Sequence, residues 1–379
     1  MVRHGILNPA CVGSSPATPA IEYAAASLCL RLSYYLIPRC SRMKNHPAQK
    51  GIAKIMARIK DVAKEAGVAA STVSLVMNKK GYVSQATREK VEAAMKKLNY
   101  VPSEVARNLS LNRTNTIGVI MPSLSHPFFG EVVEALEAAL YARSYKMMLC
   151  CTQHKDNAER TFVEMLRRRT MDGIIMGAHS LDLPLYDNIK QPIVAFDRYL
   201  NDYIPIVHCD HHQGGELAAH TLLKHNCRLV VEIVGYQGVS TPANEYHWVA
   251  ADRLRRHGVQ VEMLEMPWNA FGYRDFMASA RELFQKYPEV DGILGADMSI
   301  SACLNVAAEM GRRVPEDLKL LAYDGTATTR MGLQPITAIR QPIEELAQLA
   351  VKKIINMVNE EQDDSPWVLP PSLLEGKTC

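Results

Sequence analysis

The sequence lacks the motifs of the common catalytic and metal-binding classes. Its nine cysteines are odd in number and show no C-x-x-C spacing, so neither a disulfide framework nor a zinc site is indicated. A P-loop, a nucleophile elbow and a G-x-G-x-x-G motif are also missing. The most apolar early run, residues 21–37, is interrupted by Arg31 and is shorter than the roughly 20 residues that a membrane span needs. It also comes too late for a secretion signal. We therefore expect a cytoplasmic protein without metal, cofactor or membrane segment.

The net charge of +3 conceals segments of opposite sign. Residues 1–55 and residues 56–113 each carry +6, so the rest of the chain carries −9. A basic small domain joined to an acidic larger one is typical of a nucleic-acid reader that carries a second module. Charge alone leaves a solvated basic face as the alternative. The length of 379 residues suits two or three globular domains.

Residues 1–55 show no periodic pattern of apolar residues. We interpret them as a disordered or spurious N-terminal extension, and we expect the organised chain to begin at Met56.

Three short helices are predicted within residues 56–102. Gly67 permits a tight turn between the first two helices, and Ser84 is a suitable N-cap for the third. Two helices separated by so short a turn define a helix-turn-helix, whose second helix lies in the major groove of DNA. A three-helix domain for protein contacts is the alternative. The predicted core consists of Val62, Ala63, Ala66, Val73, Val76, Met77, Val91, Met95 and Leu98.

The run IKDVAKEAGVAASTVSLVMN, beginning at Ile59, resembles the headpiece signature of the lactose/galactose repressor family of bacterial regulators. Tyr100-Val101-Pro102 and the following ARNLSLNRTNTIGVIMP resemble that family's hinge, and the resemblance continues nearly to the end of the chain. It implies an all-α helix-turn-helix headpiece joined to an α/β two-lobed core like that of periplasmic binding proteins. It also implies a nucleoid-associated homodimer that binds double-stranded operator DNA and represses carbohydrate-utilisation genes. The YDGT run at 323–326 resembles the branch that controls sucrose genes.

The resemblance assigns DNA contacts residue by residue. Ala70, Ser71 and Leu75 occupy the base-reading positions. Ala69 stands where a capping Ser is common, and Leu75 stands where family members often carry an Arg that reads guanine. Leucine cannot make that bidentate bond, so contact with a thymine methyl is expected. The remaining predicted DNA contacts are Lys60, Thr72, Ser74, Asn78, Tyr82, Ser84, Thr87, Tyr100, Ser103 and Arg107.

Residues 103–115 are predicted to form a hinge helix and linker. Residues 103–110 can make only two turns of helix, which is marginal alone, so we expect this helix to form on DNA. Leu109 would enter a minor-groove step as an apolar wedge, with Arg107 near phosphates. A minor packing contact is the alternative for Leu109.

After Thr116, short apolar runs alternate with amphipathic helices, which predicts parallel sheets covered by helices. Helices are expected from about Phe129 and near 157–169. We expect an N-lobe of about 116–208 plus 340–358 and a C-lobe of about 209–339 plus 359–379, within a core of 116–379. The apolar runs are TIGVIMP, KMMLCCT, DGIIMG and PIVAFD in the first half, and RLVVEIVG, VQVEMLEM, DGILGAD and LKLLAYD in the second.

Ligands in such sheets bind at the C-terminal ends of the strands, where Asp197, Asp297 and Asp324 are expected. Carboxylates there can accept hydrogen bonds from sugar hydroxyls, although an Asp after a strand is also a common helix N-cap. The resemblance places Asp197 and Asp324 in the effector pocket, and assigns Asp297 to support of the fold. The effector would be a sugar or a sugar phosphate.

Other effector residues follow from the same resemblance. Phe128 and Phe129 would lie at the mouth of the pocket, and Trp268 would add an apolar wall. Family members clamp the sugar with an Arg in an R-x-x-G-F/Y run, and here Tyr246 stands at that position. Tyr246 can donate one hydrogen bond and stack, but it cannot replace the clamp.

Two other classes of protein share features with this sequence. A sugar-binding protein for transport has a similar two-lobed core, but it needs a secretion signal and no basic headpiece. A carbohydrate-acting enzyme could use Asp197 and Asp324 as acid and base, but no other catalytic motif accompanies them. His208, His211 and His212 are interpreted as loop and helix-start residues. The C-terminal tail shows no heptad repeat, so a tetramer is not expected.

Overall fold

The computed structural model describes residues 57–78, 81–102, 108, 113–153, 158–178, 183–268 and 270–379. The chain divides into two compact units, with the boundary between Val101 and Pro102. The extension of residues 1–55 and three predicted DNA contacts, Ser103, Arg107 and Leu109, lie outside the described residues. Among the residues that are described, no helix combines the length and the apolar character that crossing a membrane requires.

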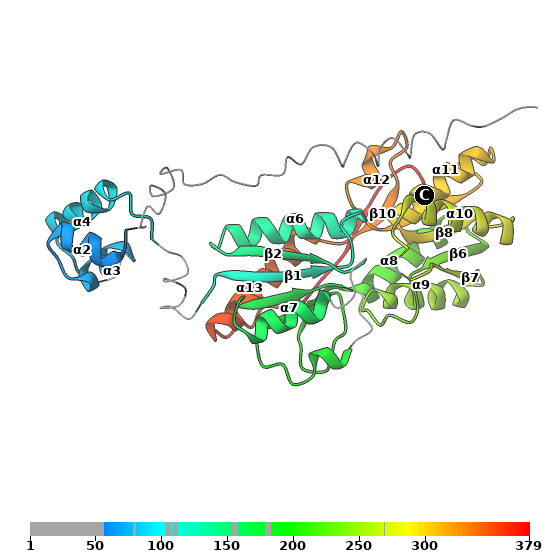
Figure 1. Cartoon of the computed structure of the whole chain (residues 1–379). Coiled ribbons are helices and arrows are strands. Elements are labelled where there is room, and N and C mark those ends of the chain that lie inside the picture. The colour runs from blue at the N-terminus through cyan, green and yellow to red at the C-terminus, as the bar shows by residue number, and fades with distance from the viewer. Residues whose placement is uncertain are drawn as a thin grey trace, which may run out of the picture. The chain divides into compact units, whose positions relative to one another are not determined.

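The first unit holds the three predicted helices, drawn in blue in Figure 1. Gly67 ends the first helix in the left-handed conformation, with φ of +66°, as the predicted tight turn requires. Ser84 caps the third helix, because its hydroxyl accepts a hydrogen bond from the backbone N–H of Thr87 at 3.3 Å. Ala69 offers no side-chain cap, yet the second helix begins directly after it. The helices are α2 (Ile59–Ala66), α3 (Ala70–Met77) and α4 (Gln85–Lys97).

One apolar cluster holds these helices together. Val62, Val73 and Val91, one from each helix, are fully buried. Val68, Met95 and Leu98 pack against the cluster while remaining partly exposed. The periodicity of 3.6 residues therefore predicted the correct inward faces.

The second unit contains two six-stranded sheets, one in each lobe. In the N-lobe all neighbouring strands are parallel, in the order β11-β5-β4-β3-β1-β2. The N-lobe strands are β1 (Thr116–Met121), β2 (Lys146–Cys151), β3 (Gly173–Met176), β4 (Ile193–Phe196), β5 (Ile206–Cys209) and β11 (Val368–Leu369). The sequence predicted β1 to β4, but not the four-residue strand β5 or the two-residue strand β11.

The C-lobe sheet has the order β12-β10-β9-β8-β6-β7, and only β12 runs antiparallel to its neighbour. The C-lobe strands are β6 (Leu229–Val234), β7 (Gln260–Glu265), β8 (Gly292–Ala296), β9 (Lys319–Asp324), β10 (Thr337–Arg340) and β12 (Ser372–Leu374). The middle strands are buried along nearly their whole length, as parallel strands covered on both faces should be.

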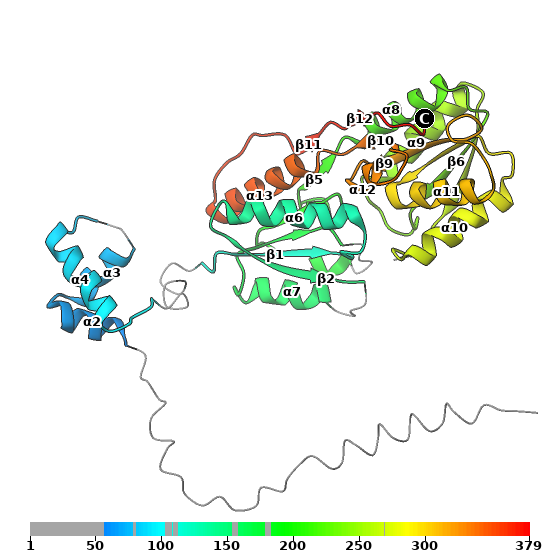
Figure 2. The same cartoon turned by 90° about the horizontal axis from the view of Figure 1, so that it is seen from above.

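Helices cover both faces of each sheet, as Figure 2 shows for the N-lobe, where α6 and α13 lie on one face and α7 on the other. In the C-lobe, α8 and α9 cover one face and α10 and α11 cover the other. The two helices predicted in the N-lobe are confirmed to within about two residues. The helices are α6 (Pro127–Tyr141), α7 (Ala158–Arg167), α8 (His211–Lys224), α9 (Asn244–Arg256), α10 (Tyr273–Lys286), α11 (Asp297–Glu309), α12 (Thr328–Met331) and α13 (Ile343–Asn359), with a short 3₁₀ helix at Leu183–Tyr186.

Three short segments join the lobes. They follow β5, β10 and β11, at residue 210, residues 341–342 and residues 370–371. The expected return to the C-lobe at residue 359 is wrong, because β11 pairs with β5 of the N-lobe before the chain crosses. A two-residue strand carries too little pattern to be recognised from sequence.

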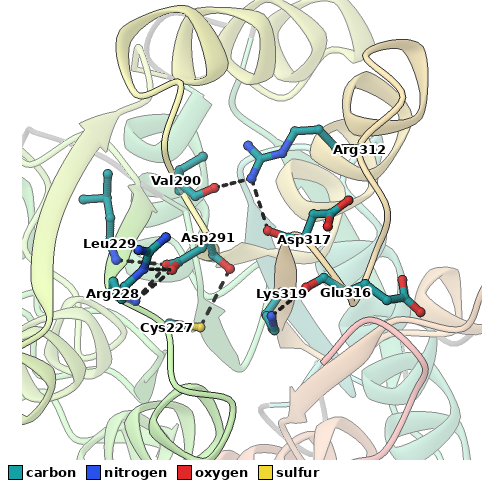
Figure 3. A network of polar contacts seen from close by, with 9 residues as sticks. All are labelled: Cys227, Arg228, Leu229, Val290, Asp291, Arg312, Glu316, Asp317 and Lys319. Atoms are coloured by element: carbon teal, nitrogen blue, oxygen red, sulfur yellow. Dashed lines mark hydrogen bonds and ion pairs between the residues drawn. The ribbon is translucent and has the colours of Figure 1, made fainter.

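Matching aspartates tie the N-terminal ends of the strands in each lobe. In the C-lobe, Asp291 accepts the backbone N–H groups of Arg228 and Leu229 at 2.9 Å (Figure 3). In the N-lobe, Asp172 accepts those of Thr114 and Asn115 at 2.8 and 2.7 Å. Each aspartate precedes a glycine that begins a strand, in the DGIIMG and DGILGAD runs. The two similar halves predicted from sequence therefore share this anchoring.

Asp172→Ala is expected to lower N-lobe stability by about 1–3 kcal/mol, because the half-buried donors of Thr114 and Asn115 lose their acceptor. Hydrogen exchange should show the loss at the start of β1. Asp291→Ala is the matched control and should increase exchange at the start of β6 instead. Equal effects of both variants on both lobes would contradict this local anchoring.

Candidate functional site

A cavity of about 210 Å³ lies between the lobes, at the C-terminal ends of their strands. It brings together all six residues predicted for the effector site: Phe128, Phe129, Asp197, Tyr246, Trp268 and Asp324. The position agrees with the general rule for ligands in parallel α/β sheets. The described residues contain no group of three or more acidic, His or Cys side chains arranged to hold a metal ion.

The two aspartates of the cavity have positive backbone φ angles. Asp197 follows β4 with φ of +50°, and Asp324 ends β9 with φ of +122°. Such angles are costly for residues with a side chain and are maintained where the surrounding structure imposes them. Both carboxylates are bonded to residues at the crossings between lobes. His211 Nε2 lies 2.9 Å from Asp197 Oδ1, and Gln341 donates to Asp324 Oδ1 at 2.9 Å.

The pKa of the Asp324 carboxyl lies well above its usual range, because burial removes it from water and Asp297 adds like charge. Asp297 is itself buried but does not line the cavity. It accepts the backbone N–H groups of Gly325 and Thr326 at 3.1 and 2.7 Å, and the Thr326 hydroxyl at 2.6 Å. The prediction that Asp297 supports the fold is confirmed by these bonds.

Tyr246 forms part of a buried aromatic stack. Its ring lies parallel to that of Tyr323, with centroids 3.6 Å apart, and the Tyr323 hydroxyl is 2.8 Å from His211 Nδ1. His211 thus links the stack in the C-lobe to Asp197 in the N-lobe. His211 and His212 begin α8, as predicted, but His208 lies on β5. The role of His211 as a link was missed, because its two partners lie 14 and 112 residues away.

Aromatic side chains also line the cavity. Phe128 and Phe129 are buried at 6% and 9% exposure, so they do not lie at a mouth as predicted. Both pack into the N-lobe core on α6, and Phe129 makes an edge-on contact with Phe271 at 5.9 Å. Trp268 lines the cavity while 49% exposed, which suits a residue at the opening.

The sequence did not predict His126, which lines the cavity just before α6. Its ring is buried beside Phe129, Phe271 and Phe276, and its Nδ1 has no hydrogen-bond partner among the described residues. Burial lowers the pKa of His126 to about 4. The imidazole is therefore neutral near pH 7 and offers one donor and one acceptor. Its place after β1 is the sequence signal that could have identified it.

A second missed histidine, His247, lies next to Tyr246 on α9 and also lines the cavity. Its Nδ1 is 2.7 Å from Oε2 of Glu232, a residue of β6 whose side chain is fully buried. Burial raises the pKa of Glu232, and the hydrogen bond from His247 opposes that rise. A glutamate inside an apolar strand has no sequence pattern that identifies its partner.

The exposed side of α3 carries the predicted base-reading residues. Ser71 and Leu75, one helical turn apart, are exposed, whereas Val73 and Val76 face inward. Ala70 is half-buried against the headpiece core, so only part of its surface can reach DNA. Of the other predicted contacts, Lys60, Tyr82 and Ser84 are exposed, and Thr72, Ser74, Asn78, Thr87 and Tyr100 are half-buried.

Comparisons with known proteins agree with this arrangement. The family model "Bacterial regulatory proteins, lacI family" matches residues 58–103, and a periplasmic binding protein-like domain matches residues 219–379. The chain is 35% identical to the sucrose operon repressor of Streptococcus mutans, covering 86% of this chain and all of that one. It is 33% identical to the ribose operon repressor of Halalkalibacterium halodurans, covering 85% and 97%.

Solved structures show the same architecture. The lac repressor dimer bound to operator is 25% identical, with a TM-score of 0.74 over 85% of this chain and 98% of that one. A complex of the transcriptional regulator CelR with cellobiose is 27% identical, with a TM-score of 0.62 over 85% and 100%. A helix-turn-helix headpiece joined to a two-lobed core with a cavity defines the class of ligand-responsive DNA-binding regulators. The chain belongs to the lacI family of bacterial regulatory proteins.

Proposed function

We propose that this chain represses carbohydrate-utilisation genes by binding operator DNA as a homodimer, and that a sugar-like effector in the cavity changes its affinity for DNA. The observation that carries the proposal is the cavity between the lobes, which Asp197 and Asp324 line together with several aromatic side chains. Carboxylates bind hydroxyl groups, and aromatic rings pack against the C–H faces of sugars. The names of the related sucrose and ribose operon repressors support the same function.

In the proposed DNA complex, α3 enters the major groove and presents Ser71 and Leu75 to base edges. Lys60 and the hydroxyls of Ser84 and Thr87 lie within reach of phosphates. A dimer presents two headpieces to two half-sites related by two-fold symmetry. The roles of Ser103, Arg107 and Leu109 in the hinge stay predictions, since these residues lie outside the described part of the chain.

The crossing segments supply a route from effector to DNA. Asp197 is bonded to His211, the first residue after one crossing, and Asp324 is bonded to Gln341 in the second. An effector that engages both carboxylates acts on both crossings and favours one arrangement of the lobes. Operator affinity then shifts by the difference in binding free energy between the two arrangements.

Selection of random double-stranded DNA by the full chain tests the DNA-binding part of the proposal. We expect enrichment of a site with two-fold symmetry, and loss of enrichment when residues 57–102 are deleted. Addition of sucrose, ribose or cellobiose to the selected DNA complex should change affinity by about 5- to 150-fold for at least one sugar. In His211→Phe that change should shrink while direct sugar binding persists. An unchanged response in this variant would contradict the route through His211.

We also propose that the chain is not an enzyme. Asp324 is buried and bonded to Gln341, and Asp197 is bonded to His211. Incubation of purified protein with sucrose and cellobiose should release no monosaccharide, and hydrolysis that scales with protein concentration would contradict this.

A further inference from the structure

We propose that the effector of this chain carries no phosphate or other negatively charged group, because the cavity selects against anions. The inference rests on the proposed function, since it concerns the effector of the same cavity. It narrows the choice between a sugar and a sugar phosphate.

In the described part of the chain, acidic side chains but no lysine or arginine line the cavity. These acidic residues are Asp197 and Asp324. Of its two histidines, His126 is buried among phenylalanines, where burial lowers its pKa, and His247 is hydrogen-bonded to the buried Glu232. Phosphate groups are bound by Arg or Lys side chains or by several converging backbone N–H groups. The described lining contains no such cationic side chain.

Arg198, the residue directly after the cavity residue Asp197, makes its contacts away from the cavity. It follows Asp197, but its side chain is 98% buried, and its guanidinium donates to the backbone carbonyl of Ser240 at 3.2 Å. Glu159 lies near enough to interact electrostatically with it. Arg198 therefore joins the lobes and balances an acidic neighbour, and it is not among the residues lining the cavity.

Tyr246 stands at the position where the family resemblance implies a sugar-clamping arginine. The stack on Tyr323 fixes its ring, and the neighbouring side chain, His247, is bonded to the buried Glu232. The C-lobe wall thus presents the stacked rings of Tyr246 and Tyr323, with the acidic side chain of Glu232 behind His247. An anionic ligand would enter a partly buried space with no lysine or arginine counterion among its described lining residues, which is unfavourable.

The raised pKa of the Asp324 carboxyl also supports the exclusion of anions. Its pKa is raised by burial and by Asp297, so the cavity does not stabilise even the negative charge of its own side chain. A phosphate dianion placed beside it would have to overcome the same lack of positive charge. A hydroxyl, by contrast, can donate to Asp197 or Asp324, and can pair with the neutral imidazole of His126.

Matched ligand pairs test the proposal on the purified full chain. The probes are ribose with ribose 5-phosphate, and sucrose with sucrose 6-phosphate, each titrated by calorimetry. We expect the neutral member to bind at least about tenfold more tightly, because an unpaired negative charge in the cavity is strongly disfavoured. Equal or tighter binding of a phosphate ester than of its neutral partner would overturn the proposal.

A charge placed at the opening supplies a control. Trp268 is half exposed, so Trp268→Lys should fold, and it should narrow the difference between neutral and phosphorylated probes by strengthening binding of the ester. Trp268→Gln removes the same indole without adding charge, and should leave the preference unchanged. A loss of preference in both variants would attribute it to packing against the indole and would overturn the electrostatic explanation.

A second measurement needs no effector. The double variant Trp248→Phe/Trp367→Phe leaves Trp268 as the single tryptophan of the chain. Quenching of its fluorescence by caesium should exceed quenching by iodide, relative to free tryptophan amide, because a negative potential attracts cations and repels anions. The opposite order would overturn the proposal. If neither member of a probe pair binds, this measurement decides.

The two proposals fail separately. Release of the selected operator by a phosphate ester, but not by its neutral partner, would keep the proposed function and overturn the anion exclusion. Tight binding of the neutral sugar without any effect on operator affinity would keep the anion exclusion and overturn the proposed function.

Discussion

His247→Leu is expected to destabilise the C-lobe by about 3–5 kcal/mol at neutral pH, because it leaves the carboxyl of Glu232 buried without a partner. Glu232 is fully buried on β6, and its Oε2 lies 2.7 Å from the ring of His247. Its other oxygen, Oε1, has no hydrogen-bond partner in the described part of the chain. Leucine fills a similar volume, so the loss reflects the missing partner and not a cavity.

The loss should depend on pH in a defined direction. Burial raises the folded-state pKa of Glu232, and the bond to His247 opposes this, so the pKa rises further in the variant. A buried carboxyl whose pKa is higher in the folded state than in the unfolded state costs no stability below the unfolded-state pKa. The free energy of unfolding then falls as the pH rises from the unfolded-state pKa to the folded-state pKa. The variant should therefore be closest to wild type near pH 5 and furthest from it near pH 8.

Urea unfolding followed by the fluorescence of Trp248, in a Trp268→Phe/Trp367→Phe background, measures this effect locally. Trp248 directly follows His247 on α9 and is exposed. The matched control is Glu232→Leu/His247→Leu, which removes both partners and should recover most of the lost stability. If the double variant is no more stable than His247→Leu, the buried carboxyl is not the cause. A loss that does not vary between pH 5 and pH 8 would contradict the titration of Glu232.

Leu75→Arg is expected to shift operator preference toward guanine at one base pair of each half-site, by about 1–3 kcal/mol per contact. Leu75 is 40% exposed on the outer side of α3, one turn after Ser71, while Val73 and Val76 hold the helix on the core. Arginine can bond to both acceptors of guanine, whereas leucine offers only apolar contact, which suits a thymine methyl. Because a dimer reads two half-sites, the shift should count twice on a symmetric operator.

Parallel selections with wild type and Leu75→Arg, followed by binding to single-base variants of each selected site, measure the shift. Lys60→Ala is the control for a backbone contact. It should weaken binding to all sequences about equally and reduce the dependence on salt. If Leu75→Arg and wild type rank the base variants in the same order, Leu75 does not read bases.

Local patterns were sufficient for the headpiece and for most of the core. The apolar spacing of Val62, Val73 and Val91, the turn at Gly67 and the cap at Ser84 act over one or two helical turns, so each could be read from adjacent residues. The apolar runs likewise predicted the longer strands. The rule for strand ends indicated Asp197, Asp297 and Asp324, of which Asp197 and Asp324 line the cavity, as the family resemblance implied.

Only the tertiary structure decided how the site is connected. The bonds from His211 to Tyr323, from Gln341 to Asp324 and from His247 to Glu232 join residues from separate elements, 15 to 112 positions apart. Such pairs depend on the packing of helices onto sheets and on where the chain crosses between lobes. The missing cysteine and nucleotide-binding motifs could be read from the sequence alone. The absence of lysine and arginine among the described residues of the cavity could not be read in this way, because the folded chain decides which residues line it.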